Sequence, residues 1–373
     1  MRSNETEVRN AEPQALNAFG GVRRVLFQTR FRVNMVFRKI FLAASYLHLN
    51  LFVKRIIDDA QTRQSYMGPV VVCVLKNGVT FVDAFIAHHK AIGFGHFIFL
   101  DNGSSDGTLE ALLKHECVSV FQTSLSYRYF KDGMAYWLLK RFGGKNWTLK
   151  ADIDEFLDFP QSEHLSVTDV LDHFKASGKF AVPLHMVDMY PAKVSRKDDG
   201  EDWLQTNTYF EAKSMRSLTY DFLFRRKHGF VSNQVNGYIG GVRERVFDVT
   251  NWLTKGMLLI PEKCGYLRDN HFLVGCRYSD TSFVLKHYRF AARFFENVEK
   301  ICASGSHFSG SVLYFPIKER LSGVDELHLF MPQVSLTYTS SLSPYEAGIG
   351  VIGADFRGTA AVARLQATEL TQN

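Results

Sequence analysis

The feature that most constrains the fold is a repeated alternation of short apolar runs with segments whose apolar residues recur at helical spacing. The runs lie between residues 70 and 151, and we expect them to be buried strands: Val70–Leu75, Phe97–Leu100, Val118–Gln122 and Trp147–Ala151. Strand–helix units of this length predict an α/β fold with a doubly wound, mostly parallel sheet and right-handed crossovers. Hydrophobic residues make up 46% of the 373 positions, which is enough to bury the core of such a sheet.

The second half of the chain departs from this simple alternation. Its apolar patterns predict a helix over 167–174, a strand over 180–187, a late strand over 283–287 and a helical stripe over 294–302. Residues 192–215 are polar and charged, so we expect a solvated loop there, which could act as a lid on the acceptor side of a site.

The chain therefore divides into three predicted parts. Residues 1–66 form a basic amphipathic arm that is expected to be helical, and residues 67–330 form one α/β domain with an acceptor-side extension. Residues 331–373 form a C-terminal extension whose small, polar end is expected to be partly disordered.

The arm carries the net charge of the whole chain. Residues 1–65 hold eleven Lys and Arg against five Asp and Glu, and the rest of the +6 chain is balanced, so a nucleic-acid partner is not expected. Two interpretations of the arm follow: a helix that lies on an anionic membrane surface, or an ordinary helix packed on the catalytic domain. The best apolar run, Phe41–Val53, is shorter than the about 20 residues that a membrane span needs.

The cysteines and the N-terminus bear on location. There are five cysteines at wide spacings without a CxxC motif, which predicts free thiols in a reducing compartment (Cys73, Cys117, Cys264, Cys276 and Cys302). The first ten residues are polar and acidic and do not resemble a signal peptide. We therefore expect a cytoplasmic protein, with the arm as a peripheral contact on the cytoplasmic face of the membrane.

The strongest chemical signal is the segment K-A-D-I-D-E-F-L over residues 150–157. In an extended segment, Asp152 and Asp154 would point to the same side, at the C-terminal end of a parallel strand where ligands bind in open α/β sheets. Two close carboxylates repel each other unless a cation lies beside them. The segment therefore predicts a site for Mg²⁺ or Mn²⁺, against the alternative of a solvated turn.

A second signal follows another strand, in the segment D-N-G-S-S-D-G-T over residues 101–108. Its Asn-Gly pair needs a turn with positive φ, and Ser105 or Asp106 can cap the helix that follows. Asp101 ends the strand, where a carboxylate can accept hydrogen bonds from a nucleobase or ribose. A well-capped strand–helix turn without a ligand is the alternative interpretation.

The two motifs together resemble glycosyltransferases of the GT-A type, family 2-like, in the subgroup that also resembles family 92. In these families a strand ending in K-N-E is followed by a helix of E-W-x-x-x-H type, then D-N-x-S-x-D-G-T and D-x-D-E-F. This chain has Lys76-Asn77, then Asp83 with His88-His89, then the segments 101–108 and 152–156, and the resemblance covers residues 68–320. It departs from the pattern at Gly78, where the families have Glu, which leaves the details of base binding open.

The resemblance implies a role for each residue that matches the pattern. Asp101 would be the acid on the nucleobase side, with Lys76 and Asn77 near the base. Asp152 would contact ribose or metal, and Asp154 would be a metal ligand. The late segment L-K-H-Y-R-F resembles the family's L-H-F-K-F and makes His287 the remaining protein ligand, with His271 as its rival.

The resemblance also implies a base that takes the proton from the acceptor hydroxyl. Asp188 lies in a D-M-Y segment like that of the subgroup, and Glu244 and Asp269 are competitors. Arg243 and Arg245 alternate as in a strand, and they would contact phosphate or an acidic sugar, or form a structural ion pair with Glu244.

The sequence therefore predicts an inverting, metal-dependent glycosyltransferase. Its partners would be a nucleotide-sugar donor, expected to be a UDP-sugar, and a polysaccharide or lipid-linked glycan acceptor. Three alternatives stay open: a phosphatase with a DxD nucleophile, a non-catalytic nucleotide-sugar-binding protein of the same fold, and a basic membrane-tethering module.

Overall fold

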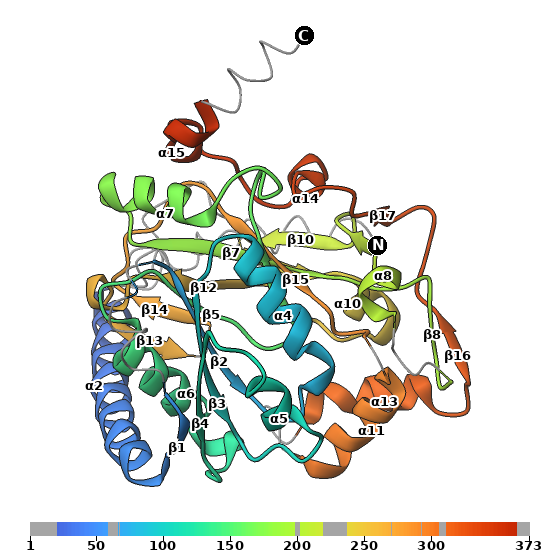
Figure 1. Cartoon of the computed structure of the whole chain (residues 1–373), viewed down its shortest axis with the longest axis horizontal. Coiled ribbons are helices and arrows are strands. Elements are labelled where there is room, and N and C mark those ends of the chain that lie inside the picture. The colour runs from blue at the N-terminus through green and yellow to red at the C-terminus, as the bar shows by residue number, and fades with distance from the viewer. Residues whose placement is uncertain are drawn as a thin grey trace.

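A computed structural model of the chain describes residues 21–58, 66, 68–197, 202–218, 237–269, 271–291, 293–305 and 311–363. Its centre is a nine-stranded sheet with the order β1-β4-β3-β2-β5-β12-β7-β15-β6 (Figure 1). In that order the strands are Lys54–Ile57, Val118–Gln122, His96–Asp101, Val70–Leu75, Thr148–Lys150, Thr254–Leu259, Ala181–Asp188, Phe283–His287 and Glu155–Asp158.

Most strands of this sheet run in one direction. β2, β3, β4 and β5 are parallel neighbours, and β7 and β15 form a second parallel pair. β12 lies antiparallel between β5 and β7, so these two parallel groups point the same way. Only β1, β6 and β12 run in the opposite direction among the described strands of the sheet. The predicted α/β fold with a mostly parallel sheet is confirmed.

Helices cover both faces of the sheet, as a doubly wound fold requires (Figure 1). One face of β2 presents Val71, Cys73 and Leu75 to a core that includes residues from α4 (Val79–Ala91), α5 (Thr108–Leu112), α7 (Val167–Ala176) and α15 (Ala354–Arg357). The other face presents Val70, Val72 and Val74 to α2 (Gly21–Phe52) and α6 (Tyr127–Leu138). Alternate residues of a strand point to opposite faces, so a continuous valine-rich run serves two cores at once.

A third apolar cluster lies beside the sheet. It joins α10 (Val242–Phe247), α11 (Phe294–Ser304) and α13 (Phe315–Leu321) to the paired strands β8 (Lys193–Ser195) and β16 (Glu326–His328). β9 (Tyr209–Glu211) pairs with β17 (Ser335–Thr337). The remaining short elements are η1 (Leu139–Gly143), α8 (Trp203–Thr206), β10 (Met215–Leu218), β11 (Gly237–Gly240), η2 (Pro261–Lys263), β13 (Tyr266–Asp269), β14 (Phe272–Val274), η3 (Val312–Tyr314) and α14 (Ser343–Glu346).

Two predictions about irregular segments can be compared with the structure. The polar stretch 192–215 is not a plain solvated loop, because its described part contains β8, α8 and β9. The Trp203 side chain is buried against the rings of Phe81 and Phe156, which ties the segment to the sheet. The described part of the C-terminal extension contains β17, α14 and α15, whereas residues 364–373 lie outside the described residues.

The prediction that all cysteines are free thiols is wrong. Cys264 and Cys276 form a disulfide that closes the β13–β14 hairpin, while Cys73, Cys117 and Cys302 are free. The two bonded cysteines are 12 positions apart, and only the antiparallel pairing of β13 with β14 brings them together. Because disulfides persist in oxidising environments, the cysteines no longer support a reducing compartment.

One face of the arm helix α2 packs on α6. Gly133 allows the close approach, because a Cβ atom there would lie 2.7 Å from Cβ of Ser45. Trp137 donates its indole N–H to Asn50 at 2.8 Å, and Arg38 pairs with Asp132 at 2.8 Å. One side of the arm helix therefore packs on the domain, as the second of the two interpretations predicted. Among the described helices, none has the length and apolar character needed to cross a membrane.

Candidate active site

Two loops, at the carboxyl ends of β2 and β3, are joined by hydrogen bonds. Asn77, with a φ of 55°, accepts a hydrogen bond from the Ser105 N–H at 2.9 Å and donates its own N–H to the Ser104 hydroxyl at 2.8 Å. The Gly78 N–H donates to the Thr108 hydroxyl at 2.8 Å. Sequence reasoning expected these two loops at one edge of the sheet, and the structure brings them into direct contact.

Asp101 is buried and holds the shape of its own loop. Its carboxylate accepts the Ser104 N–H at 3.2 Å, the Ser104 hydroxyl, and the Gln122 amide N–H at 2.9 Å. Gly103 has a φ of 76°, as the Asn-Gly turn requires. Lys76, in contrast, is exposed at the rim of the loop.

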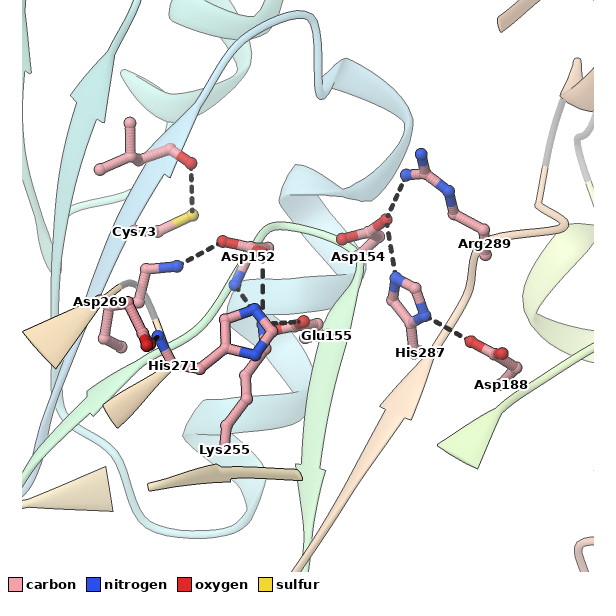
Figure 2. Close-up of polar contacts among 12 residues, drawn as sticks. Cys73, Asp152, Asp154, Glu155, Asp188, Lys255, Asp269, His271, His287 and Arg289 are labelled. Carbon is pink, nitrogen blue, oxygen red and sulfur yellow. Dashed lines mark hydrogen bonds and ion pairs between the residues drawn. The ribbon is translucent and has the colours of Figure 1, made fainter. Parts of the chain in front are cut away.

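Asp152 and Asp154 lie in a turn between β5 and β6. The expected extended segment is absent at this point, because the Glu155 N–H donates back to the carbonyl of Asp152 at 3.0 Å. Ile153, at the centre of the turn, faces Gly78, where a Cβ atom would approach the isoleucine side chain to 3.1 Å. The two carboxylates are close neighbours that meet different partners (Figure 2).

Asp152 is held by two lysines from neighbouring strands. Nζ of Lys150 lies 2.6 Å from Oδ1, and Nζ of Lys255 lies 3.3 Å from Oδ2. Lys255 also pairs with Glu155, whose other carboxylate oxygen accepts the Asp152 N–H at 3.0 Å. The Lys150, Lys255 and Glu155 side chains are at most 2% exposed, whereas that of Asp152 is 34% exposed.

The charges of this cluster compensate one another within the protein. Burial opposes ionisation of Asp152, but the ammonium groups of Lys150 and Lys255 outweigh it and hold the pKa of this carboxyl well below its usual range. Burial likewise disfavours charged Lys150, and the Asp152 and Glu155 carboxylates reverse the effect and raise the pKa of its ammonium. Two ammonium groups thus face two carboxylates.

Asp154 meets a histidine instead. Nε2 of His287, at the end of β15, lies 3.4 Å from Oδ2 of Asp154, and Nδ1 lies 2.6 Å from Oδ1 of Asp188, at the end of β7. Arg289 places Nη1 3.4 Å from the same Asp154 oxygen. The parallel pairing of β7 with β15 sets Asp188 directly opposite His287, which explains the contact.

The electrostatics of this second group favour charged side chains. Burial disfavours the imidazolium of His287, but Asp154 and Asp188 outweigh burial and raise its pKa to about 9. Burial also opposes ionisation of Asp188, which Arg243 and His287 overcome, so that its pKa falls to about 2. Arg243 approaches Asp188 with Nε at 2.7 Å.

The rival histidine lies on the other side of the site. His271 follows Asp269 in the β13–β14 turn, near the Asp152 cluster (Figure 2), and its N–H donates to the Asp269 carboxylate at 2.8 Å. Burial first, and then the charge of Lys255, hold the pKa of His271 well below its usual value. Of the two histidines, His287 is the one that faces Asp154.

The remaining predicted base, Glu244, belongs to a surface ion pair. It binds Arg216, with Nη2 at 3.1 Å, and accepts the Thr250 hydroxyl at 2.7 Å. Arg243 and Arg245 do not alternate on a strand, because both lie in helix α10. Neither forms the expected pair with Glu244, since Arg243 binds Asp188 and Arg245 binds Glu211 at 2.8 Å.

Helix α4 secures the strand that follows the two aspartates. Nε2 of His88 bonds to the Leu157 carbonyl at 2.6 Å, and the Leu157 N–H donates to Nε2 of His89 at 3.2 Å. Nδ1 of His89 bonds to the Phe85 carbonyl at 2.8 Å, so His89 is a neutral donor–acceptor bridge. Burial is the first cause of the strongly lowered pKa of His89.

Sequence reasoning missed four charged residues of the site. Lys255 had one visible signal, a lysine within the apolar strand sequence T-K-G-M-L-L. Lys150 and Glu155 stood inside the recognised motif, and Arg289 stood two positions after His287, but none of these received a role. The pairs of Lys255 with Glu155 and of Arg289 with Asp154 join segments distant in sequence, so only the fold reveals them.

Comparisons with known proteins give a partial match. No family model matches the chain. Over 107 residues the chain is 31% identical to a protein of Oryza sativa subsp. japonica described as a glycosyltransferase family 92 protein, and the match covers 28% of this chain and 18% of the rice protein. The chain thus spans less than a fifth of that relative, whose description agrees with the resemblance seen in the motifs.

Two crystal structures of S. aureus TarS align with parts of the chain. One, of residues 1–349, has a TM-score of 0.25 and 17% identity, and it covers 32% of this chain and 35% of that one. The other has a TM-score of 0.32 and 14% identity, and it covers 68% of this chain and 43% of that one. Both alignments are distant in sequence and in shape.

Proposed function

We propose that this protein is a glycosyltransferase that moves a sugar from a nucleotide-sugar donor, with a divalent cation held by Asp154 and His287. The observation that carries the proposal is the line of Asp154, just before β6, with His287 and Asp188, which end the neighbouring parallel strands β15 and β7. The motif resemblance and the family 92 relative support the reaction class.

The residues present fit a divalent cation. A metal-bound histidine commonly donates its second ring N–H to a carboxylate, which fixes the ring, and Nδ1 of His287 has this contact with Asp188. Nε2 then faces Asp154, where a cation would take the place of a proton. When bound, the cation would neutralise the diphosphate leaving group.

The protein would supply only part of the coordination sphere. Within the described part of the chain, no group of three or more His, Cys, Asp or Glu side chains is placed to hold a metal ion. Mg²⁺ and Mn²⁺ sites of transferases commonly combine one or two protein ligands with substrate phosphates and water. We therefore assign two protein ligands and leave the other positions to the donor.

Asp152 has a different proposed role. Both of its oxygens accept from lysines, so its charge is balanced without a metal ion. Its side chain is nevertheless 34% exposed at the edge where the donor would lie. We assign it to the donor's ribose, with Asp101, Asn77 and Lys76 on the nucleobase side.

The three carboxylates that were predicted as candidates for the base have different surroundings. Asp188 is 4% exposed on its side chain and bonded to both Arg243 and His287, which suits a residue that orients His287. Glu244 is tied to Arg216 and Thr250 on α10. Asp269, at the end of β13 beside the Asp152 cluster, is the base that we assign.

The donor and acceptor rest on the family resemblance. We propose a UDP-sugar donor, a polysaccharide or lipid-linked acceptor, and inversion at the sugar carbon. A phosphatase with a DxD nucleophile is the weaker alternative, because both oxygens of Asp152 already bind ammonium groups. A protein that binds the donor without turnover is the second alternative, since the Gly78 departure affects the base-binding loop.

Thermal melting tests the proposal. The full chain is melted with Mn²⁺ and UDP, GDP, CDP or TDP in turn, alongside Asp154→Ala and the matched control Asp172→Ala, whose aspartate is exposed on α7. Ligands that bind only the folded state raise the melting temperature. We expect one nucleotide to raise it in a Mn²⁺-dependent way in wild type and in Asp172→Ala, but not in Asp154→Ala.

The same panel separates the alternatives. The metal site would be contradicted if none of the four nucleotides raised the melting temperature of wild type. It would also be contradicted if Asp154→Ala showed the same rise as wild type. A separate assay measures the release of nucleotide from nucleotide sugars, with simple sugars and polysaccharides as acceptors. A metal-dependent rise in melting temperature without any such release would favour the non-catalytic binding protein.

A further inference from the structure

Within the described residues, helix α2 packs one apolar face on the fold and leaves apolar side chains exposed on the other side. Leu42, Ser45 and Leu49 are buried against α6. On the opposite side, large apolar side chains are 57–80% exposed: Val36, Phe37, Ile40, Leu47 and Leu51. Figure 1 shows α2 on the outside of the molecule, with α6 between it and the sheet.

The exposed residues form a stripe and are not scattered. At 3.6 residues per turn, positions 36, 40, 47 and 51 fall within a narrow sector of the helix surface, and Phe37 borders it. With a rise of about 1.5 Å per residue, the stripe is about 22 Å long. Soluble proteins rarely leave a continuous apolar strip of this kind uncovered unless it is a contact surface.

The exposed charges described near the stripe are basic. The sequence Gly21–Phe52 has no Asp or Glu, and of its described basic side chains Arg38 is bound to Asp132 while Lys39 is exposed. Lys54 and Arg55 follow directly in β1, where both are exposed, and Ile57 adds an apolar side chain that is 43% exposed. An occupant of this surface must therefore combine apolar groups with negative charge.

We propose that the stripe of α2 docks on an anionic lipid surface, with its apolar side chains in the headgroup region and the basic residues beside lipid phosphates. An apolar helix face flanked by Lys and Arg is the typical composition of helices that lie in a membrane interface. A second copy of the chain fits less well, because two such helices would bring like charges together. This inference does not depend on the proposed reaction, since it concerns a different part of the molecule.

Vesicle sedimentation with the full chain tests the inference. Wild type is mixed with vesicles of phosphatidylcholine, with or without phosphatidylglycerol, next to the triple variant Phe37→Ser, Ile40→Ser, Leu47→Ser. The matched control replaces three apolar residues on the other side of the molecule, Val312→Ser, Leu313→Ser and Phe315→Ser, which are 39–50% exposed. Melting curves establish that all three proteins are folded.

We expect wild type and the control to sediment with the anionic vesicles, and the α2 variant to lose affinity at least about tenfold. Added salt should weaken binding, because the basic residues contribute through screened charges. Wild type that stays in solution with anionic vesicles would overturn the inference, as would binding that the α2 variant retains in full. A dimer in light scattering that the α2 variant breaks, without vesicle binding, would overturn it in favour of self-association.

Discussion

Asp152 and Asp154 are separated by one residue, yet their charges are balanced in opposite ways. Asp152 lies between two buried lysines of the sheet, whereas Asp154 faces His287 and Arg289. The difference teaches that a DxD motif need not act as one unit. The first acid belongs to the lysine network of the sheet, and the second is the one to which we assign the proposed cation.

Asp154→Ala tests the proposed cation site at the second aspartate, and we expect it to have the largest effect of the variants. It removes one of two proposed protein ligands of the cation, so we expect turnover to fall at least about 10³-fold. Initial rates of nucleotide release at saturating Mn²⁺ measure the loss. Asp172→Ala should keep the wild-type rate, and an Asp154→Ala rate within a few fold of wild type would refute the assignment.

Lys255→Met tests the charge network around Asp152, and we expect it to lower the stability of the fold. It leaves Glu155 buried without its ammonium partner, and the loss of one member of a buried pair costs about 3–5 kcal/mol. Urea unfolding gives the free energy of unfolding. The control Lys193→Met removes an exposed pair with Glu326 and should cost less than about 1 kcal/mol. Equal costs for the two variants would argue against a buried network.

Asp188→Asn sharpens the comparison, because it leaves both aspartates of the motif in place. The change weakens the contact that orients His287, and loss of such a partner lowers metal affinity about 10–100-fold. Calorimetric titration with Mn²⁺ in the presence of the nucleotide measures it. If Asp188 is instead the base, Mn²⁺ affinity will stay at the wild-type level while turnover collapses.

Asp280 and Asp355, which lie far from the motif, show how a second acid changes the pKa of a carboxyl group. The Asp280 N–H donates to Asp355 at 2.8 Å, and burial, followed by the hydrogen bond to Asp280, raises the pKa of Asp355 to about 6. A raised carboxyl pKa stabilises the fold below the unfolded value near 3.8, and the stability is lost as pH rises through about 6.

Asp355→Asn should remove this pH dependence, which is the smallest of the predicted effects. Asp355 is only partly buried, so solvent screening reduces the effect, and between about pH 4 and pH 7 we expect wild type to lose about 1 kcal/mol relative to the variant. Urea unfolding at both pH values measures the difference. Parallel pH profiles of the two proteins would contradict the prediction.

The sequence allowed the parallel half of the sheet to be predicted nearly residue by residue. Val118–Gln122 and Phe283–His287 have the predicted bounds, because strands buried on both faces are continuous apolar runs with clear ends. The antiparallel β12 was not predicted, since its place between β5 and β7 depends on pairings with distant segments, such as Leu258 with Leu149 and Lys255 with Leu184. Its lysine, Lys255, was missed for the same reason.

The candidate site was predictable where one segment carries it. Asp152, Asp154 and Asp101 stand in compact motifs at strand ends, and the structure places all of them at one edge of the sheet. Their partners were not predictable, because the contact of His287 with Asp188 comes from strand register and that of Asp152 with Lys255 comes from sheet order. The Cys264–Cys276 bond likewise needs the hairpin to be known.

The bonds from His88 and His89 to Leu157 have a consequence for aggregation. β6 is the last strand in the order of the sheet, and such a border strand offers unpaired backbone groups on which strands of other molecules can assemble. At Leu157 both backbone groups are already taken by the two imidazoles of α4. The histidines therefore protect the strand that follows the Asp152–Asp154 turn from amyloid-like pairing without placing another strand beside it.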